Sequence, residues 1–261
     1  MGRFEDGKNA AARHATLRLI GLALIAWLGG ATAAAGQDGT TKEFWPEIDA
    51  WLRLSPAWRL SMFVPISKNL ETYYREGNLI LQADYAFGRI KSPQKRRMVD
   101  DSRALEMKRF LFRGGYLGGM SLDDQGAEYT EYAALFELHV RTPFKGGILL
   151  TGRLRSDLRW LGDNHEFSTR WRYRLMLEKE FKLGRSSIIP YVSVEPYYDS
   201  RYEIVNRVRL IGGATVVWSP RFALETNITY QHDSKSSVTK LWALNVILHV
   251  YFETARAREP S

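Results

Sequence analysis

Residues 167–183 read FSTRWRYRLMLEKEFKL, and the pattern in this stretch decides the fold. Alternate positions from Phe167 to Leu183 are mostly aromatic or aliphatic, whereas the positions between them are mostly charged. On a helix the arginines would spread around all sides and no apolar stripe would form, but on a strand the two kinds of residue separate onto two faces. The stretch therefore predicts a long β-strand with one apolar and one charged face.

The same alternation recurs along the chain and predicts about eleven strands, much longer than the usual 5–6 residues. Such strands have the length that a tilted strand needs to cross a bilayer, which is about 9–11 residues. We therefore predict an all-β protein with one domain over residues 36–252, an antiparallel up-and-down transmembrane β-barrel. The remaining expected strands are 44–54, 58–64, 79–87, 105–116, 132–140, 150–158, 188–198, 208–218, 222–230 and 242–252.

The connections between these strands alternate in length. Residues 55–57, 143–147, 184–187 and 219–221 are short and rich in Pro, Gly and Ser, and longer polar stretches lie at 66–77, 117–128, 161–166, 199–203 and 233–239. Short turns on one rim and longer loops on the other are typical of transmembrane barrels. If both ends lie on the periplasmic side, the strand number must be even, so we expect about twelve strands, with ten as the alternative.

The N-terminus has the pattern of a secretory signal peptide. Basic residues between Arg3 and Arg18 precede the apolar run Leu19–Leu28, and small residues lead to Ala33 and Ala35. This order predicts a signal peptide over residues 1–35, cleaved after Ala35, with Ala33 as the alternative. No later run of about 20 apolar residues exists that would form a transmembrane helix. A short polar tail, 253–261, follows the last expected strand.

Alternation by itself does not say which face points inward. Aromatic residues lie near the ends of the expected strands, as girdles at the two lipid–water interfaces require. They include Trp58, Phe167, Trp218, Phe222, Tyr230 and Trp242. We therefore expect the apolar face to contact lipid in the outer membrane of a Gram-negative cell envelope, as in a porin-like barrel. The alternative is a soluble exported barrel with its apolar face inward, binding an apolar ligand.

Composition excludes several classes of protein. The 261 residues include no Cys, which rules out a disulfide framework, a thiolate metal site and a Cys nucleophile. A mean hydropathy of −0.31 is too polar for a bundle of membrane helices. The net charge of +8 comes with no nucleic-acid-binding motif, so we predict no nucleic-acid partner. The basic run Lys91–Arg97 is interpreted as a solvated loop, with docking on anionic head groups as a further option.

Several segments resemble an uncharacterised family of bacterial outer-membrane barrels, domain of unknown function 2490. They are the Trp-led first strand Phe44-Trp45-Pro46-Glu47, the hairpins Leu54–Leu60 and Trp218–Leu224, and the central block Arg170–Leu175 followed by Ile189-Pro190-Tyr191 and Glu195. The resemblance extends over residues 44–252. It implies an outer-membrane barrel without an assigned reaction, whose partners are outer-membrane lipids, lipopolysaccharide and the barrel-assembly machinery. Two features depart from the pattern: the polar tail after Phe252 and the long basic segment 88–103.

A lipid-facing apolar side places many charges in the lumen. The predicted cluster consists of Arg153, Arg155, Asp157, Arg170, Arg172, Arg174, Glu178, Glu195, Arg207 and Arg209. A regular hairpin across 161–166 would place Asp157 opposite Arg170, but it would also place arginines opposite each other, which destabilises unless carboxylates or an anion intervene. Two interpretations remain: a lumen filled with salt bridges, or a cation-rich constriction that selects anions.

Motifs for catalysis are scarce, and we predict no enzymatic activity, no cofactor and no metal site. The sequence offers one alternative. His232-Asp233-Ser234 lies at the end of an expected strand, and it resembles the H-x-S-N element of outer-membrane lipid hydrolases, in which the His acts as general base for the Ser. Lys235 occupies the position of the Asn in that element. The alternative function is therefore a lipid-modifying hydrolase that uses His232 and Ser234.

Overall fold

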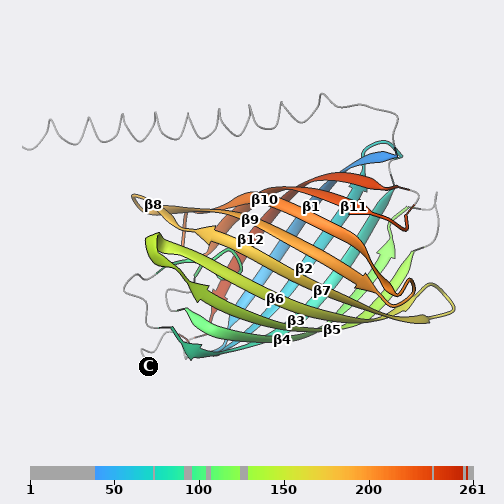
Figure 1. Ribbon diagram of the computed structural model, residues 1–261. Coiled ribbons are helices and arrows are strands. Elements are labelled where there is room, and N and C mark those ends of the chain that lie inside the picture. The colour runs from blue at the N-terminus through green and yellow to red at the C-terminus, as the bar shows by residue number, and fades with distance from the viewer. Residues whose placement is uncertain are drawn as a thin grey trace, which may run out of the picture. The chain divides into compact units, whose positions relative to one another are not determined.

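The structure is a computed structural model that describes residues 39–72, 74–90, 96–103, 107–123, 129–236, 238–254 and 257. The predicted signal peptide lies outside these residues. The described chain forms twelve β-strands and one short 3₁₀ turn, Lys145–Gly147 (Figure 1). The strands are β1 (Thr40–Arg53), β2 (Trp58–Asn69), β3 (Arg75–Arg89), β4 (Lys108–Ser121), β5 (Thr130–Pro143), β6 (Ile148–Leu161), β7 (Glu166–Lys179), β8 (Phe181–Leu183), β9 (Ser186–Asp199), β10 (Ile204–Val217), β11 (Phe222–Asp233) and β12 (Lys240–Glu253).

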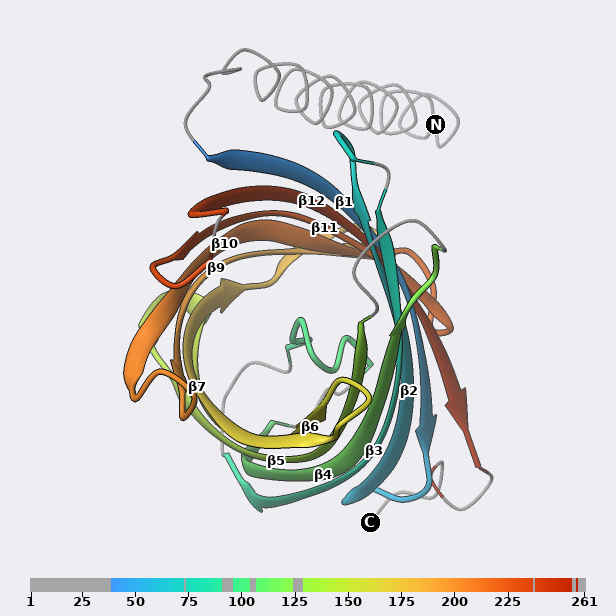
Figure 2. The ribbon, with the colours of Figure 1, turned by 90° about the vertical axis from the view of Figure 1, so that its right-hand side faces the viewer.

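The strands form one closed barrel, which confirms the predicted all-β barrel fold. Each long strand pairs with its neighbours in the chain, β7 pairs with β9, β9 with β10, and β12 with β1. The short strand β8 pairs with β9 alone among the described strands, so eleven strands make the ring. Figure 2 shows the ring nearly end-on.

The even number of strands expected for the ring is wrong, and so is the expectation that all neighbouring strands run antiparallel. Strands β1 and β12 run parallel, with Thr40 opposite Lys240 and Arg53 opposite Glu253. An up-and-down ring with an odd number of strands brings its first and last strands together in the same direction, so one parallel seam is unavoidable. The described chain therefore enters β1 at one rim and leaves β12 at the other.

The stretch 167–183 also forms two strands rather than one. Strand β7 ends at Lys179, and β8 begins after Glu180. The Glu180 carboxylate accepts hydrogen bonds from the Ser187 hydroxyl at 2.6 Å and the Arg97 backbone N–H at 2.9 Å. Glu180 thus contacts the β8–β9 hairpin at Ser187 and an interior segment at Arg97. The interruption at Glu180 separates β7 from β8.

The apolar face points outward and the charged face inward. On β2, the outward-facing Leu60 side chain is 42% exposed, while its neighbours Arg59 and Ser61 are buried. The same alternation follows the other long strands. Since the described lumen is lined mostly by charged and polar side chains, the alternative barrel with an inward apolar face is wrong.

The barrel has two rims, a turn rim and a loop rim, which differ in the connections they carry. The turn rim carries the connections 54–57, 90–107, 144–147, 180–185 and 218–221, and the loop rim carries 70–74, 122–129, 162–165, 200–203 and 234–239. The loops expected at 66–77 and 117–128 are shorter than predicted. Pairing continues through Lys68 opposite Arg75 and Glu76 opposite Ser121, because the long strands extend beyond the clear alternation.

An interior segment between β3 and β4 fills part of the barrel. Residues 96–103, called the plug below, lie inside the ring in Figure 2. The Met98 side chain is 1% exposed, and Ser102 is 0% exposed. Arg96 is also buried and donates to the Ile148 carbonyl at 3.1 Å. The prediction of a solvated basic loop is therefore wrong for Arg96, whereas Arg97 is half-buried beside Glu180 and Lys91–Lys95 lie outside the described residues.

Candidate functional site

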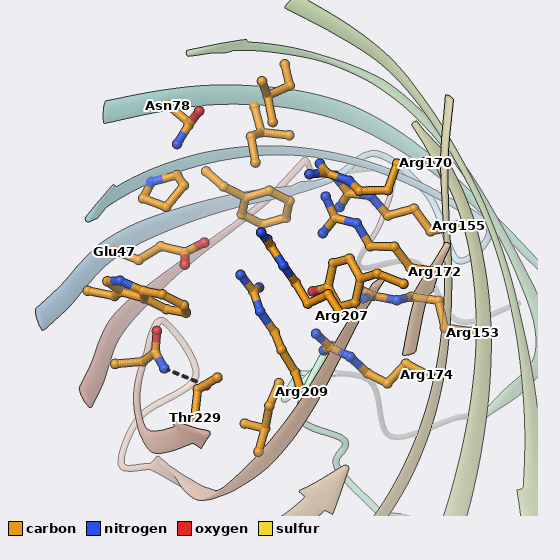
Figure 3. Close-up of a pocket in the computed structure, with 18 of the residues that line it drawn as sticks. Glu47, Asn78, Arg153, Arg155, Arg170, Arg172, Arg174, Arg207, Arg209 and Thr229 are labelled. Carbon is orange, nitrogen blue, oxygen red and sulfur yellow. Dashed lines mark hydrogen bonds between the residues drawn. The ribbon is translucent and has the colours of Figure 1, made fainter. Parts of the chain in front are cut away.

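The lumen contains a cavity of about 700 Å³ that extends from the loop rim to the plug. Strand alternation directs every second side chain into it. Seven predicted arginines line the cavity: Arg153, Arg155, Arg170, Arg172, Arg174, Arg207 and Arg209 (Figure 3). Two predicted carboxylates, Asp157 and Glu195, are buried against these arginines and contact them.

The register between β6 and β7 is the one expected from the sequence. Asp157 lies opposite Arg170, Arg155 opposite Arg172, and Arg153 opposite Arg174. Two of these three cross-strand pairs bring like charges together, which destabilises a sheet unless anions separate them. The compensating carboxylates come from β6 itself and from strands β5 and β9, which flank the β6–β7 hairpin.

Glu195 of β9 neutralises the pair Arg153 and Arg174. Its carboxylate accepts from Arg174 Nη2 at 2.9 Å and also pairs with Arg153. The Tyr197 hydroxyl donates to the same carboxylate at 3.0 Å. Glu195 has no exposed surface, so its charge depends entirely on these partners.

Asp157 of β6 has the same role for a second group of arginines. Its carboxylate contacts Arg155 Nε at 2.5 Å, Arg170 Nε at 2.8 Å and Arg172 Nη2 at 2.7 Å. Three guanidinium groups around one carboxylate leave a local excess of positive charge. Glu137 of β5 reduces that excess through Arg155 Nη1 at 3.1 Å.

Sequence reasoning missed a second cluster on β2–β5. Asp84 pairs with Arg59 and with Arg113 Nε at 2.6 Å, and Arg113 Nη1 reaches Glu137 at 3.3 Å. His139 Nε2 also lies 2.8 Å from Glu137. Cross-strand register brings these groups together, with Arg59 opposite Asp84 and Arg113 opposite Glu137. The sequence signal that could have found this cluster is the alternation of polar and apolar residues, combined with the register of the hairpins.

Glu178, predicted as part of the arginine cluster, contacts the plug instead. Its carboxylate accepts the Val99 backbone N–H at 3.1 Å. It lies at the turn-rim end of β7, where the plug enters, and among the described residues no ion pair joins it to an arginine of the cluster.

Ion pairs hold the plug to strands around the ring. Asp101 contacts Arg53 at 3.1 Å and Arg59 at 2.9 Å, and Asp100 pairs with Arg141. Burial alone would raise the pKa of the Asp100 carboxyl, but the charges of Arg141 and His139 outweigh burial and hold this pKa well below its usual range. Asp100 therefore carries negative charge at neutral pH.

Strand β10 supplies two arginines with different surroundings. Arg207 contacts Asp233 through Nε at 2.8 Å and Nη2 at 2.7 Å. Arg209 donates from Nε to the Gln231 side-chain oxygen at 2.7 Å, and within the described residues no carboxylate lies within 4.0 Å of its guanidinium. The Arg209 guanidinium carbon lies 5.1 Å from the ring centres of both Tyr197 and Trp45.

The wall opposite the arginines carries acids and amides. His249 lies between Asp49, at 3.1 Å from Nδ1, and Glu225, at 3.3 Å from Nε2. Asn245 donates to the Thr229 hydroxyl at 3.0 Å, which is the contact drawn in Figure 3. Glu47 also faces the cavity on this side (Figure 3). Among the described residues that line the cavity, arginines come mostly from β6, β7 and β10, and none comes from β1, β11 or β12.

Among the described residues no hydrogen bond joins His232 to Ser234. His232 is exposed on the outer face of β11, and Ser234 follows the strand. The Ser234 hydroxyl donates to the Asn206 carbonyl at 3.2 Å, so its described hydrogen bond does not involve His232. No group of three or more potential metal ligands is found in the part of the chain that the structure describes. Within the same residues no helix is long and apolar enough to cross a membrane.

Comparison with known proteins identifies the family. The sequence profile of a family described as "Protein of unknown function (DUF2490)" matches residues 105–241, more than half of the chain. The chain belongs to this family. The match confirms the resemblance found in the sequence and covers strands β4–β11. These strands carry the arginine wall, which consists of Arg153, Arg155, Arg170, Arg172, Arg174, Arg207 and Arg209.

No curated protein matches the chain. Among solved structures, the crystal structure of the beta domain of the Bordetella autotransporter Brka covers 72% of this chain and 81% of its own, with 12% identity and a TM-score of 0.42. The barrel assignment rests on the strand pairing of the chain itself.

Proposed function

We propose that this protein spans the outer membrane as a lipid-embedded barrel and takes small anionic solutes into its lumen. The observation that carries the proposal is the distribution of side chains, with large apolar residues exposed on the outside and arginines buried inside. A protein surrounded by water would hide the apolar face, whereas acyl chains solvate it.

Outward-facing aromatic side chains near both rims support the membrane location. Near the turn rim, Trp58, Tyr85, Phe87 and Phe110 form a row with ring centres 4.9–5.7 Å apart. Near the loop rim, Tyr230 and Trp242 pack at 4.9 Å. Aromatic rings prefer the interfaces between lipid and water, and two such bands fit a barrel embedded across a membrane. In this setting its partners are membrane lipids, lipopolysaccharide and the machinery that assembles barrels.

The lumen suits binding and passage rather than catalysis. The cavity reaches residues at the loop rim, such as Tyr202 and Lys235, and it reaches Val99 and Asp100 of the plug. A solute entering from the loop rim therefore meets the arginine wall before the plug. In the plugged state we expect low conductance, and the arginine wall should favour anions over cations.

The first test establishes the membrane location. The protein should fractionate with the outer membrane and migrate faster on a gel when it is not boiled. Recovery as a water-soluble protein without detergent would contradict the proposal.

The second test measures passage in planar bilayers under a salt gradient. Wild-type protein should give small anion-preferring currents. The double variant Arg172→Ala and Arg174→Ala should lose part of this preference, whereas Arg185→Ala, an exposed residue outside the cavity, should not. An unchanged reversal potential in the double variant would contradict an anion-selective lumen.

A further inference from the structure

One arginine in the lumen differs from the others in its surroundings. Among the described arginines that line the cavity, Arg209 is the one with no carboxylate within ion-pair distance, since Arg113, Arg153, Arg155, Arg159, Arg170, Arg172, Arg174, Arg201 and Arg207 all have one. A charge in a narrow lumen is costly unless it is hydrated or paired. Arg209 is therefore available to pair with an external anion.

The Arg209 side chain is also held in place. Its guanidinium lies beside Tyr197 and Trp45, with both ring centres at 5.1 Å, and Gln231 accepts its Nε–H at 2.7 Å. Tyr197 and Gln231 belong to the strands on either side of β10, whereas Trp45 belongs to β1, so the side chain extends across the lumen (Figure 3). These contacts use the ring faces and Nε and leave the terminal Nη groups for a ligand.

The same cavity has an apolar lining on strands β2–β4. Phe63, Ile80 and Leu117 face inward there, on strands whose other inward residues are mostly polar. Phe63 and Leu117 are buried by neighbouring side chains, and Ile80 packs between the two clusters to which they belong. An inward apolar lining has no role in hydrating a simple ion, but it suits the apolar body of an organic solute.

We propose that the cavity binds a small organic monocarboxylate, with the carboxylate on Arg209 and the apolar body against Phe63, Ile80 and Leu117. A monoanion fits because one cavity arginine has no carboxylate partner of its own, and a planar carboxylate matches the two Nη groups of a guanidinium. The cavity volume of about 700 Å³ lies in the range of small-molecule sites. This inference rests on the proposed function for the entry of anions, and it names their chemical class.

The test uses full-length protein in lipid nanodiscs and isothermal titration calorimetry. The probes are 2-naphthoate, its neutral analogue 2-naphthamide, acetate and inorganic phosphate, each corrected against empty nanodiscs. Naphthoate should bind more tightly than the other three probes. Arg209→Gln should weaken naphthoate binding about tenfold or more, because a hydrogen-bonded charge is removed. Arg209→Lys should retain part of the affinity, and Arg185→Gln, the matched control outside the cavity, should leave it unchanged.

The apolar lining is tested separately by Leu117→Ala. This variant should weaken naphthoate binding several-fold and leave acetate binding unchanged, because only naphthoate has a body that contacts the lining. Each variant is first checked for the heat-dependent gel shift of the folded barrel. If Arg209→Gln does not fold, Trp45→Leu, which keeps the charge but removes one ring beside it, should also weaken binding.

Equal binding of naphthoate and naphthamide, or full affinity in Arg209→Gln, would overturn the inference, as would tighter binding of phosphate than of naphthoate. The outcome is independent of conductance. If bilayers show no current but naphthoate binding depends on Arg209, passage fails and the binding site stands. If currents prefer anions but no probe binds, passage of anions stands and the proposed binding site fails.

Discussion

At the scale of single residues, the lumen depends on a few carboxylates that each neutralise several arginines. Glu195 and Asp157 are fully buried and contact five arginines between them. A buried ion pair adds little net stability compared with apolar packing, but loss of one partner leaves a buried charge unpaired. These carboxylates should therefore be far more sensitive to substitution than the arginines at the cavity surface.

We expect Glu195→Gln to destabilise the barrel by about 3–5 kcal/mol, the usual cost of breaking a buried pair. The change preserves size and removes the charge that neutralises Arg153 and Arg174. Denaturant-induced unfolding in lipid vesicles measures the loss. Glu166→Gln is the matched control, because Glu166 is exposed at the start of β7. Equal stability of the two variants would contradict the role of Glu195.

The plug should respond to acid in a defined direction. Because Arg141 and His139 hold the pKa of Asp100 below its usual range, its ionised form stabilises the folded state above the unfolded pKa of about 4 and loses this effect as pH falls through the folded pKa. The stability difference between wild type and Asp100→Asn should be constant from pH 8 to pH 5 and shrink at lower pH. Thermal unfolding at several pH values measures it, and a difference that grows with acidification would be inconsistent with the ion pair.

At the scale of elements, the strands pass close to each other where β10 meets β11. A Cβ added to Gly213 would collide with the Thr226 carbonyl oxygen and the Asn227 side chain. Its neighbour Gly212 faces outward, and a Cβ there would meet nothing within 4 Å. Gly213 thus permits a close approach of two backbones, which a side chain would prevent.

We expect Gly213→Ala to destabilise the barrel by roughly 1–3 kcal/mol, because the neighbouring strand must shift. Gly212→Ala should change stability by no more than about 0.5 kcal/mol, as for most uncrowded surface positions. The pair differs by one position in the chain and by the face of the sheet, so unfolding experiments under one condition compare them directly. Similar losses in both variants would mean that strand propensity, and not the close approach, sets the requirement for glycine.

At the scale of the whole molecule, the parallel seam determines where the chain enters and leaves the ring. The first residues of β1 and β12 are paired, so Thr40 lies at the loop rim together with the start of β12. In outer-membrane barrels short turns face the periplasm and longer loops face outward. In the proposed outer-membrane location, the start of β1 should therefore face the cell exterior.

The absence of native cysteine makes this arrangement testable by labelling. In intact cells a membrane-impermeant maleimide should label Thr40→Cys and Asp163→Cys, both at the loop rim, but not Arg185→Cys in the hairpin at the turn rim. After the outer membrane is permeabilised, Arg185→Cys should react as well. Labelling of Thr40→Cys together with Arg185→Cys would contradict the parallel seam.

Part of the candidate site could be predicted from the sequence, and part of it could not. Alternation predicted the inward position of Arg172 and Arg209, and hairpin register predicted the facing of Arg153 and Arg174. Neither pattern carries information about contacts between distant strands. The apposition of Arg209 and Trp45, which lie on strands at opposite ends of the chain, was therefore not predictable.

The sequence by itself determined the class of fold and which face of the strands points outward, because strand periodicity is a local property of the residues concerned. Only the tertiary structure decided the number of strands in the ring, the parallel seam and the inward course of residues 96–103. These features depend on ring closure and on ion pairs such as Asp101 with Arg53, which join residues far apart in the chain. Long-range pairing of this kind leaves no periodic trace in the residues that take part in it.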